Sequence, residues 1–296
     1  MSQVVYIFNP TAGNGRALKI RDRLWKLYPD LKNHWIEGKH AEHARQQLRK
    51  RLAEQAIDRV IAIGGDGTAR SVAHLLLEDR LADRIAFGLV PAGTGSDFAR
   101  LLGLPKKPEQ ALRLALDAEP RPIDAIRIET DSGIRTYCLN IASAGLSGAV
   151  DLAVNAGPVH GSYLWTTLKA VFAYRPIPCR VWADGEELTR GPFFVVAMAN
   201  GQFFGKGMKV APQAKIDDGL LDVVLVPPVP RWQMPLRMTQ FMLGKHVDLP
   251  QVISRHAKEV RIEPPPGFFP FDLDGETLEA EAATFRILPG ALRLLA

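Results

Sequence analysis

Short apolar runs alternate with helical patterns through the first hundred positions of the chain. The runs at 4–8, 60–63 and 85–90 have the length and composition of buried strands. Each is followed by a glycine-bearing turn and then by apolar residues at roughly helical spacing. A shorter strand at 34–36 and a charged helix at 41–56 complete this region. The alternation predicts a parallel sheet with crossover helices.

The pattern changes at Pro120-Arg121-Pro122, beyond which short and β-rich runs dominate. Asp184-Gly185 and Asp218-Gly219 supply turns of the hairpin type. We expect a second, mainly antiparallel domain that begins near residue 125 and contains two helical segments. The expected strands are 123–129, 136–141, 177–183, 193–199 and 220–226, and the expected helices are 164–174 and 232–243.

Composition narrows the class of protein without identifying a ligand. Hydrophobic residues make up 47% of the chain and charged residues 23%, which is ample for a core. No apolar run approaches the length of a membrane span, and the N-terminus has no signal-peptide pattern. The two cysteines have neither metal nor disulfide spacing, and the net charge of +5 suits an anionic ligand or surface. We expect a cytoplasmic protein.

The stretch from Ile61 to Arg70 carries the strongest chemical signal. Glycines at 64, 65 and 67 permit backbone angles and close approach that a Cβ would forbid. Thr68 is placed to cap the helix expected from Ser71 onward, and a helix N-terminus favours an anion. For a single Asp-Gly, an ordinary strand-to-helix turn is the preferred explanation. Three glycines, an acid and a cap together favour a phosphate site.

Two further glycine turns follow strands, at 9–16 and 91–100. The first is not a P-loop, because no Gly-Lys-Ser/Thr follows, and it lacks the third glycine of a dinucleotide fingerprint. Turns at the carboxyl ends of parallel strands converge on one crevice, where open α/β sheets bind their ligands. We therefore expect the three turns to form one site.

The order of these motifs over nearly the whole chain resembles the diacylglycerol kinase catalytic family, which includes bacterial lipid kinases and sphingosine kinases. The resemblance rests on the three turns, on two later turns, Asp-Asp-Gly and Asp-Gly-Glu, and on several shorter pieces. The matching pieces are 9–13, 64–68, 91–94, Asp124 with Asn140, 205–208, 214–221 and 273–276.

The resemblance implies a fold of the class α/β plus β. It has an N-terminal parallel α/β nucleotide-binding domain at 1–124 and a mainly β lipid-substrate domain, an antiparallel β-sandwich, at 125–296. The last strand is left free to return to the first domain, and the active site is expected in the cleft between the domains. The implied activity is an ATP- and Mg²⁺-dependent lipid kinase acting on diacylglycerol or a related lipid at the membrane surface. No nucleic-acid partner is expected, and a homodimer is left open.

The resemblance also assigns roles to individual residues. Glu276 corresponds to the proton acceptor, with Asp274 and Asp124 close by. A structural Mg²⁺ is expected on the carbonyls of Lys215 and Leu220 and the carboxylate of Asp218. The nucleotide is expected on Asn9, Pro10, Thr11, Ala12, Gly13, Gly64, Gly65, Asp66, Gly67, Thr68 and Thr94.

Some positions depart from the family pattern. Arg70 and Ser96 stand where asparagine is usual, and a threonine that touches nucleotide in relatives has no clear counterpart near 35–37. These departures concern recognition of adenine and ribose rather than the phosphate cradle.

Two features are ambiguous in the sequence. Asp-Gly-Glu occurs at 184–186 and at 274–276, and a hairpin turn explains both copies. The apolar approach at 268–271 and the resemblance favour the second copy as the functional one. Along 232–243, Met234, Met238, Phe241 and Met242 share a helical face. This face suits either core packing or an acyl chain.

Two other functions compete with a lipid kinase. NAD kinases share the Gly-Gly-Asp-Gly turn and the two-domain plan, but they carry an Asn-Glu pair. None of the six asparagines here precedes a glutamate. A non-catalytic nucleotide-binding regulator is the other alternative, and the intact pair Asp274 and Glu276 argues against it.

Overall fold

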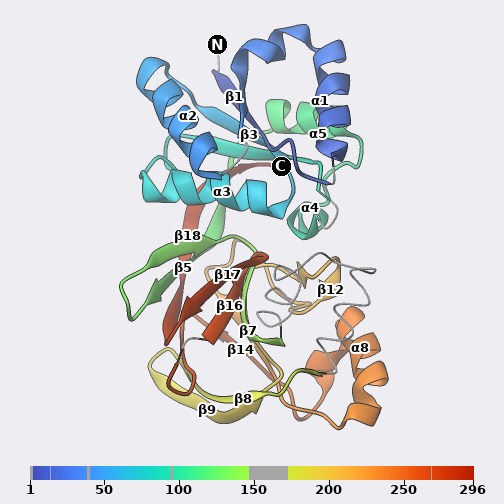
Figure 1. Cartoon of the computed structure of the whole chain (residues 1–296), viewed down its shortest axis with the longest axis vertical. Helices are drawn as coiled ribbons and strands as arrows, with labels where there is room; N and C mark the ends of the chain where they lie inside the picture. The colour runs from blue at the N-terminus through green and yellow to red at the C-terminus, as the bar shows by residue number, and fades with distance from the viewer. Residues whose placement is uncertain (1–2, 14, 39–40, 94–95, 147–172, 268) are drawn as a thin grey trace. The chain divides into compact units, whose positions relative to one another are not determined.

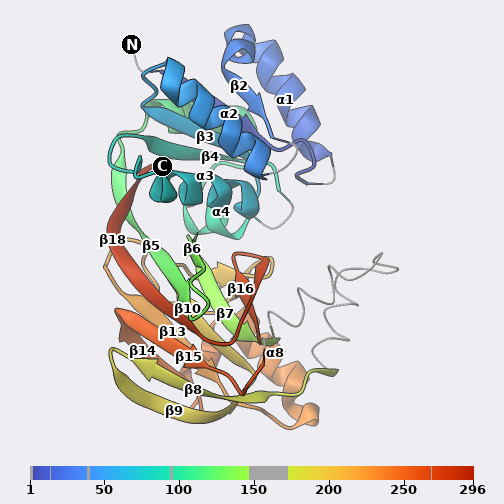
Figure 2. The same ribbon diagram turned by 60° about the vertical axis from the view of Figure 1, so that its left-hand side comes forward.

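The computed structural model describes residues 3–13, 15–38, 41–93, 96–146, 173–267 and 269–296 (Figures 1 and 2). The chain forms two compact units. The first unit consists of Met1–Asp124 together with Gly290–Ala296, and the second consists of Ala125–Pro289. Each unit is described by itself.

The first unit is built on a parallel sheet. Strand β1 (Val4–Phe8) lies between β2 (Trp35–Glu37) and β3 (Arg59–Gly64). Strand β4 (Ala86–Pro91) continues the sheet beside β3, again in parallel. The last residues of β18 (Ala283–Leu295) pair in parallel with β4, through Arg293–Leu295. The end of the chain therefore completes the sheet that its beginning starts.

Helices cover both faces of this sheet. α1 (Arg16–Leu27) and α5 (Pro108–Asp117) share one apolar core with it, because α1 turns residues at helical spacing, such as Ile20 and Leu24, towards the strands. α2 (Ala41–Glu54) and α3 (Asp66–Glu78) pack together on the other side (Figure 1). A short helix, α4 (Asp97–Leu101), follows β4.

The second unit is a β-sandwich. Six antiparallel strands form one sheet, in the order β14-β13-β10-β7-β16-β17. Strands β9, β8, β15 and β18 follow one another in the facing sheet, where β5 pairs with β18 and with β6. The bounds of the first sheet are β7 Ile141–Gly145, β10 Val195–Ala199, β13 Leu221–Val226, β14 Ile253–Ala257, β16 Phe269–Leu273 and β17 Glu276–Ala280. Those of the facing sheet are β5 Arg121–Thr130, β6 Arg135–Cys138, β8 Ile177–Ala183, β9 Glu186–Phe193 and β15 Glu259–Glu263.

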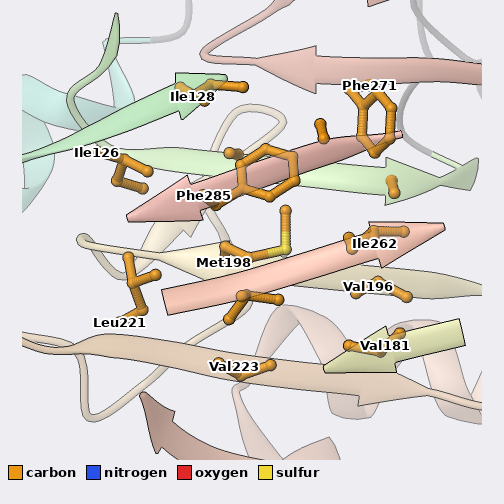
Figure 3. Close-up of a cluster of buried hydrophobic side chains, with 14 of the residues drawn as sticks. Ile126, Ile128, Val181, Val196, Met198, Leu221, Val223, Ile262, Phe271 and Phe285 are labelled. Carbon is orange, nitrogen blue, oxygen red and sulfur yellow. The ribbon is translucent and has the colours of Figure 1, made fainter. Parts of the chain in front are cut away.

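Alternate residues of the two sheets meet in one buried apolar layer (Figure 3). Ile128, Ile262 and Phe285 come from one sheet, and Met198 and Phe271 come from the other. Every second residue of a strand points to the same face of its sheet, and the apolar residues of the alternating pattern are those that point into this layer.

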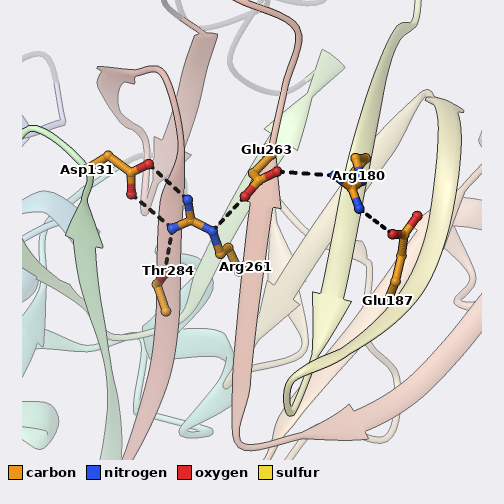
Figure 4. Close-up of polar contacts among 6 residues, drawn as sticks. All are labelled: Asp131, Arg180, Glu187, Arg261, Glu263 and Thr284. Atoms are coloured by element: carbon orange, nitrogen blue, oxygen red, sulfur yellow. Dashed lines mark hydrogen bonds and ion pairs between the residues drawn. The ribbon is translucent and has the colours of Figure 1, made fainter.

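A chain of ion pairs runs across β15, β8 and β9 (Figure 4). Arg261 holds Asp131 with a bidentate contact at 2.9 Å and Glu263 at 3.0 Å, and Arg180 holds Glu187 at 2.6 Å. The hydrogen bond from Arg261 lowers the pKa of the Asp131 carboxyl. The Arg261–Asp131 ion pair therefore stabilises the fold at pH values above the ordinary pKa of an aspartate. This contribution is lost as the pH falls through the lowered pKa of Asp131.

The fold class predicted from the sequence is confirmed, with corrections to several elements. α3 begins at Asp66, well before Ser71, and its N-cap is Gly65, so the prediction that Thr68 caps this helix is wrong. The helix expected at 164–174 lies almost wholly outside the described residues. Among the described helices, none has both the length and the apolar character that a bilayer crossing requires. Of the strands named above, β7, β9 and β14–β17 were not predicted, whereas a last strand returning to the first domain was allowed for.

Candidate phosphate site and carboxylate clamps

The three glycine turns come together at the carboxyl ends of β1, β3 and β4. A Cβ on Gly13 would lie 2.3 Å from the carbonyl oxygen of Ala92, and a Cβ on Gly93 would lie 2.7 Å from the Cα of Gly65. The backbone N–H of Ala92 also donates to the carbonyl of Gly64 at 2.7 Å. Only glycine permits this backbone-to-backbone packing. The convergence expected from the sequence is therefore present.

The N-terminus of α3 faces the converged turns with little side-chain cover. Its N-cap, Gly65, brings no side chain to the first helical turn. An ideal Cβ on Gly67 would meet no atom within 4 Å, whereas a Cβ on Gly64 would collide with Thr68 Oγ1 at 2.1 Å. The arrangement leaves room for an anion at the positive end of a 13-residue helix. The cradle therefore fits a phosphate group.

Asp66 joins the second turn to the third. Its Oδ2 accepts the N–H of Asp97 at 2.9 Å and its Oδ1 accepts the N–H of Phe98 at 3.1 Å. The carboxylate thus caps the start of α4, a role that the sequence did not predict for it. Asp66 holds the second glycine turn against the third through these bonds.

Asn9 shapes the first turn in a similar way. Its Oδ1 accepts the backbone N–H of Thr11 at 3.0 Å and the Thr11 hydroxyl at 2.7 Å. Thr94, the remaining residue assigned to nucleotide, lies outside the described residues.

The departures from the family pattern have local consequences. Ser96 adopts a left-handed conformation, with φ of 49°, and occupies the N-cap position of α4, where its side chain makes no capping hydrogen bond. Asparagine tolerates that conformation better than serine does, which explains the usual residue there. Arg70 is buried in α3 beside His74, whose pKa is lowered to about 4 by burial, with Arg45 and Arg70 adding to the effect. His74 is therefore neutral near pH 7.

In the second unit, Asp274 is a backbone clamp. Its carboxylate accepts the N–H groups of Leu139 at 2.7 Å, Asn140 at 3.1 Å and Ile141 at 3.0 Å. Its own N–H donates to the carbonyl of Ile141 at 3.2 Å. These bonds fix the β16–β17 hairpin to the start of β7. Asp274 is thus placed to position its neighbours rather than to take a proton.

The other Asp-Gly-Glu copy uses the same device. Asp184 and Gly185 have φ values of 50° and 86°, and Asp274 and Gly275 have 53° and 87°, so both pairs form two-residue turns of the I′ type. Asp184 Oδ1 accepts the N–H groups of Lys258 and Glu259 at 2.8 and 2.9 Å. The backbone does not distinguish the two copies, and their difference must lie in what each glutamate faces.

Glu276 is exposed at the start of β17, opposite Leu273 of β16. Polar groups that the sequence did not single out surround this hairpin. Asp272 is buried in β16, accepts the N–H of Gly275 at 2.8 Å and is paired in register with Ser143 of β7. Asp272 could have been singled out in the sequence, because it is a charged residue within an otherwise apolar strand.

Two buried polar atoms beside the clamp, Asn140 Oδ1 and Thr277 Oγ1, have no hydrogen-bond partner within the described part of the chain. Asp124, the other assigned carboxylate, is buried in the first unit, where its Oδ1 accepts the N–H of Gly290 at 2.7 Å. It ties β5 to the returning end of β18.

The loop before β13 offers the oxygen donors assigned to Mg²⁺. Asp218 is exposed, and its Oδ1 accepts the N–H of Leu220 at 3.1 Å. Burial raises the pKa of the nearby Asp222 carboxyl, His256 opposes this rise, and the charge of Asp218 adds to it. A cation would relieve this repulsion between acids, and carboxylate and carbonyl oxygens are the ligands that Mg²⁺ prefers. The types of donor assigned to this loop are therefore those that Mg²⁺ uses. Among the described residues, no cluster of three or more His, Cys, Asp or Glu side chains is arranged to hold a metal ion.

The methionine-bearing helix is α8 (Met234–Met242). Met234 is buried, and Phe241 packs against the apolar cluster that contains Ile141. Met242, by contrast, is 48% exposed. Of the four residues expected to share a helical face, Met234 is therefore part of the core, whereas the side chain of Met242 is half exposed to solvent.

A glycine-rich turn at a helix N-terminus can cradle phosphate, and a carboxylate can hold a metal ion or orient a nucleophile, and phosphoryl transfer uses groups of both kinds. With this fold they define a transferase of the kinase class. Residues 3–128 match the family described as diacylglycerol kinase catalytic domain. Residues 140–296 match the YegS C-terminal NAD kinase beta sandwich-like domain. The chain belongs to the diacylglycerol kinase family of lipid kinases.

Individual relatives agree with this assignment. The chain is 31% identical to the diacylglycerol kinase of Mycobacterium tuberculosis (strain ATCC 25618 / H37Rv), over 100% of this chain and 95% of the relative. It is 32% identical to a protein named "Probable lipid kinase YegS-like" from Stenotrophomonas maltophilia (strain K279a), over 88% of this chain and 84% of the relative. The solved structure of a diacylglycerol kinase from Bacillus anthracis str. Sterne has the same fold, with a TM-score of 0.72 at 22% identity, covering 99% and 96% of the two chains.

Proposed function

We propose that this enzyme is an ATP- and Mg²⁺-dependent kinase that transfers the γ-phosphate to a hydroxyl of diacylglycerol or a closely related lipid. The observation that carries the proposal is the convergence of three glycine turns, with Gly65 packed against Gly93 at the N-terminus of α3. Such a cradle suits the phosphates of a nucleotide. The family supplies the class of the acceptor.

The proposal divides the work between the two units. In the first, the backbone at 9–13 and 64–68, together with Thr94, holds the nucleotide phosphates, and Asp66 keeps the second and third turns in register. In the second unit, Lys215, Asp218 and Leu220 hold Mg²⁺, which supplies positive charge. Asp274 fixes the hairpin that presents Glu276.

The chemical step needs a proton acceptor, because a lipid hydroxyl is a weak nucleophile. As the hydroxyl oxygen bonds to the γ-phosphorus, the bond from that phosphorus to the β–γ bridging oxygen breaks and ADP leaves. The hydroxyl proton passes to the carboxylate of Glu276. A positioned base contributes about 10²–10⁴-fold to the rate of such a step.

Transfer of radiolabelled phosphate from ATP to a panel of lipids tests the proposal, with NAD as a second acceptor. Label on diacylglycerol or a related lipid supports it. Label on NAD alone would assign the enzyme to NAD phosphorylation, and binding of ATP without any transfer would leave a nucleotide-binding regulator.

The metal site makes a separate prediction. Asp218→Ala is expected to lower activity and to abolish the rise in melting temperature that Mg²⁺ produces, because a bound ligand stabilises the folded state by about 2.7 kcal/mol at one hundred times its dissociation constant. Scanning calorimetry with and without Mg²⁺ measures this. Asp217→Ala, at the exposed neighbouring acid, is the matched control and should keep the response. A wild-type melting temperature that is the same with and without Mg²⁺ would refute the site.

A further inference from the structure

Helix α8, drawn in orange in Figure 1, has only uncharged residues among its exposed positions. Its exposed positions recur at helical spacing, as expected for one outward stripe. An outward stripe normally carries charged and polar residues. Here it consists of Pro235, Leu236, Thr239, Met242 and, just past the helix, Leu243.

Large apolar side chains are concentrated there. Leu236 and Leu243 are each 60% exposed, and Trp232, in the 3₁₀ turn Arg231–Gln233 that precedes α8, is 80% exposed. Four of the ten large apolar side chains that are exposed in the described residues fall in this one segment. Trp232, Leu236, Met242 and Leu243 are called the α8 docking face below. Contiguous apolar patches of this kind mark interaction sites.

The opposite side of α8 already has its partners. Met234 is buried, and the Phe241 ring lies 4.2 Å from His246 and 6.1 Å from Phe204 between ring centroids. The helix is seated in the second unit by this inner side. The α8 docking face is therefore held in place by the packing of the opposite side of the helix. Its residues are exposed although the helix is packed in its own unit.

Within the segment 223–247, which contains α8, all the charged side chains are basic, and the nearest acid along the chain is Asp248 at the end of the following 3₁₀ turn. Arg231 and Lys245 are exposed at the two ends of α8, and the aliphatic chain of Lys209 lies close to Gly244. An apolar stripe rimmed by cations fits a surface that offers both hydrocarbon and negative charge, as the interface of an anionic bilayer does.

We infer that the α8 docking face binds the enzyme to anionic phospholipid membranes, with the helix lying in the plane of the interface. Trp232 suits the headgroup level, where indole rings concentrate, and Leu236 and Leu243 reach the acyl boundary. Arg231 and Lys245 contact lipid phosphates. The inference rests on the proposed function, since a kinase that acts on a membrane lipid must reach its acceptor at the bilayer.

Sedimentation of the full chain with vesicles, in the absence of nucleotide, tests the inference. Vesicles of phosphatidylglycerol mixed with phosphatidylcholine are compared with vesicles of phosphatidylcholine alone. The double variant Trp232→Ala, Leu243→Asn should bind the anionic vesicles at least about tenfold more weakly than wild type. Arg231→Gln with Lys245→Gln should lose the preference for anionic vesicles and much of its salt dependence.

Leu27→Asn with Ile134→Asn is the matched control, because these residues are also apolar and are 52% and 46% exposed. It should bind as wild type does. Equal weakening in the control and the docking-face variant, or no weakening in the latter, would overturn the inference. So would sedimentation velocity that shows the docking-face variant to split a dimer while vesicle binding stays unchanged.

A second readout separates this inference from the proposed function. With a short-chain diacylglycerol dispersed as monomers, the docking-face variant should keep wild-type turnover, whereas with vesicle-borne diacylglycerol its turnover should fall in line with its binding. A wild-type enzyme that phosphorylates no lipid would refute the proposed function. Weaker vesicle binding by the variant would still support the docking face in that case.

Discussion

Replacing Glu276 with glutamine is expected to reduce lipid phosphorylation by about 100-fold or more, because the amide keeps the shape of the side chain and cannot take the hydroxyl proton. The hairpin should remain intact, since its fixed point is the Asp274 carboxylate and not Glu276. Initial rates of labelled phosphate transfer measure the loss. Titration with a fluorescent ATP analogue should give a dissociation constant within about twofold of wild type, as for a group that acts in the transition state.

The molecule contains a control for this experiment. Glu186 occupies the same place in a second Asp-Gly-Glu hairpin of the same turn type, with a similar clamp from Asp184. Glu186→Gln should leave turnover unchanged. A loss in this variant instead would show that the wrong copy was chosen. Small and equal losses in both would exclude either glutamate as the base and would direct the next test to Asp124.

Replacing Asp66 with alanine is expected to lower phosphate transfer by about 100-fold or more and also to destabilise the protein, because catalysis by positioning fails when the phosphate-facing turns separate. The change leaves the N–H groups of Asp97 and Phe98 without the oxygens that they now bind at 2.9 and 3.1 Å. Loss of such a helix cap costs about 1–2 kcal/mol. Chemical denaturation measures the stability, and the transfer assay measures the rate.

Asp66→Asn distinguishes positioning from direct charge effects. Asparagine offers one acceptor oxygen where the structure uses two, so activity and stability should both fall to intermediate values if Asp66 acts through α4. Activity as low as that of the alanine variant, with wild-type stability, would instead indicate that the negative charge acts on the phosphates or their metal. Ser71→Ala, which removes only the bond from Ser71 Oγ to the Gly67 carbonyl on the same helix, should change little.

The first unit was the more predictable part of the fold. β1 and the stretch of β3 from Val60 to Ile63 are uninterrupted apolar runs, and such runs are unambiguous where both faces of a sheet are covered. Strands such as β9 and β14 were missed because exposed and charged residues interrupt their pattern. The second unit buries only one face of these strands, which halves the apolar signal.

The roles of the site carboxylates could not be predicted from local sequence. Asp66 binds N–H groups 31 and 32 positions away, and Asp274 binds N–H groups 133 to 135 positions away. The local sequence motifs single out these two acids, but they do not show which distant backbone N–H groups the carboxylates bind. The glycine turns were found because their chemistry is local.

The path of β18 has a consequence for synthesis on the ribosome. The first unit needs Arg293–Leu295 beside β4, and Leu292, Leu294 and Leu295 are buried there. While the nascent chain is being made, β4 remains an edge strand, and edges of this kind invite wrong pairing. The first unit is thus the first to be synthesised and among the last to be finished. A stop codon a few residues early should yield a protein whose first unit is open to aggregation, although every glycine turn is present.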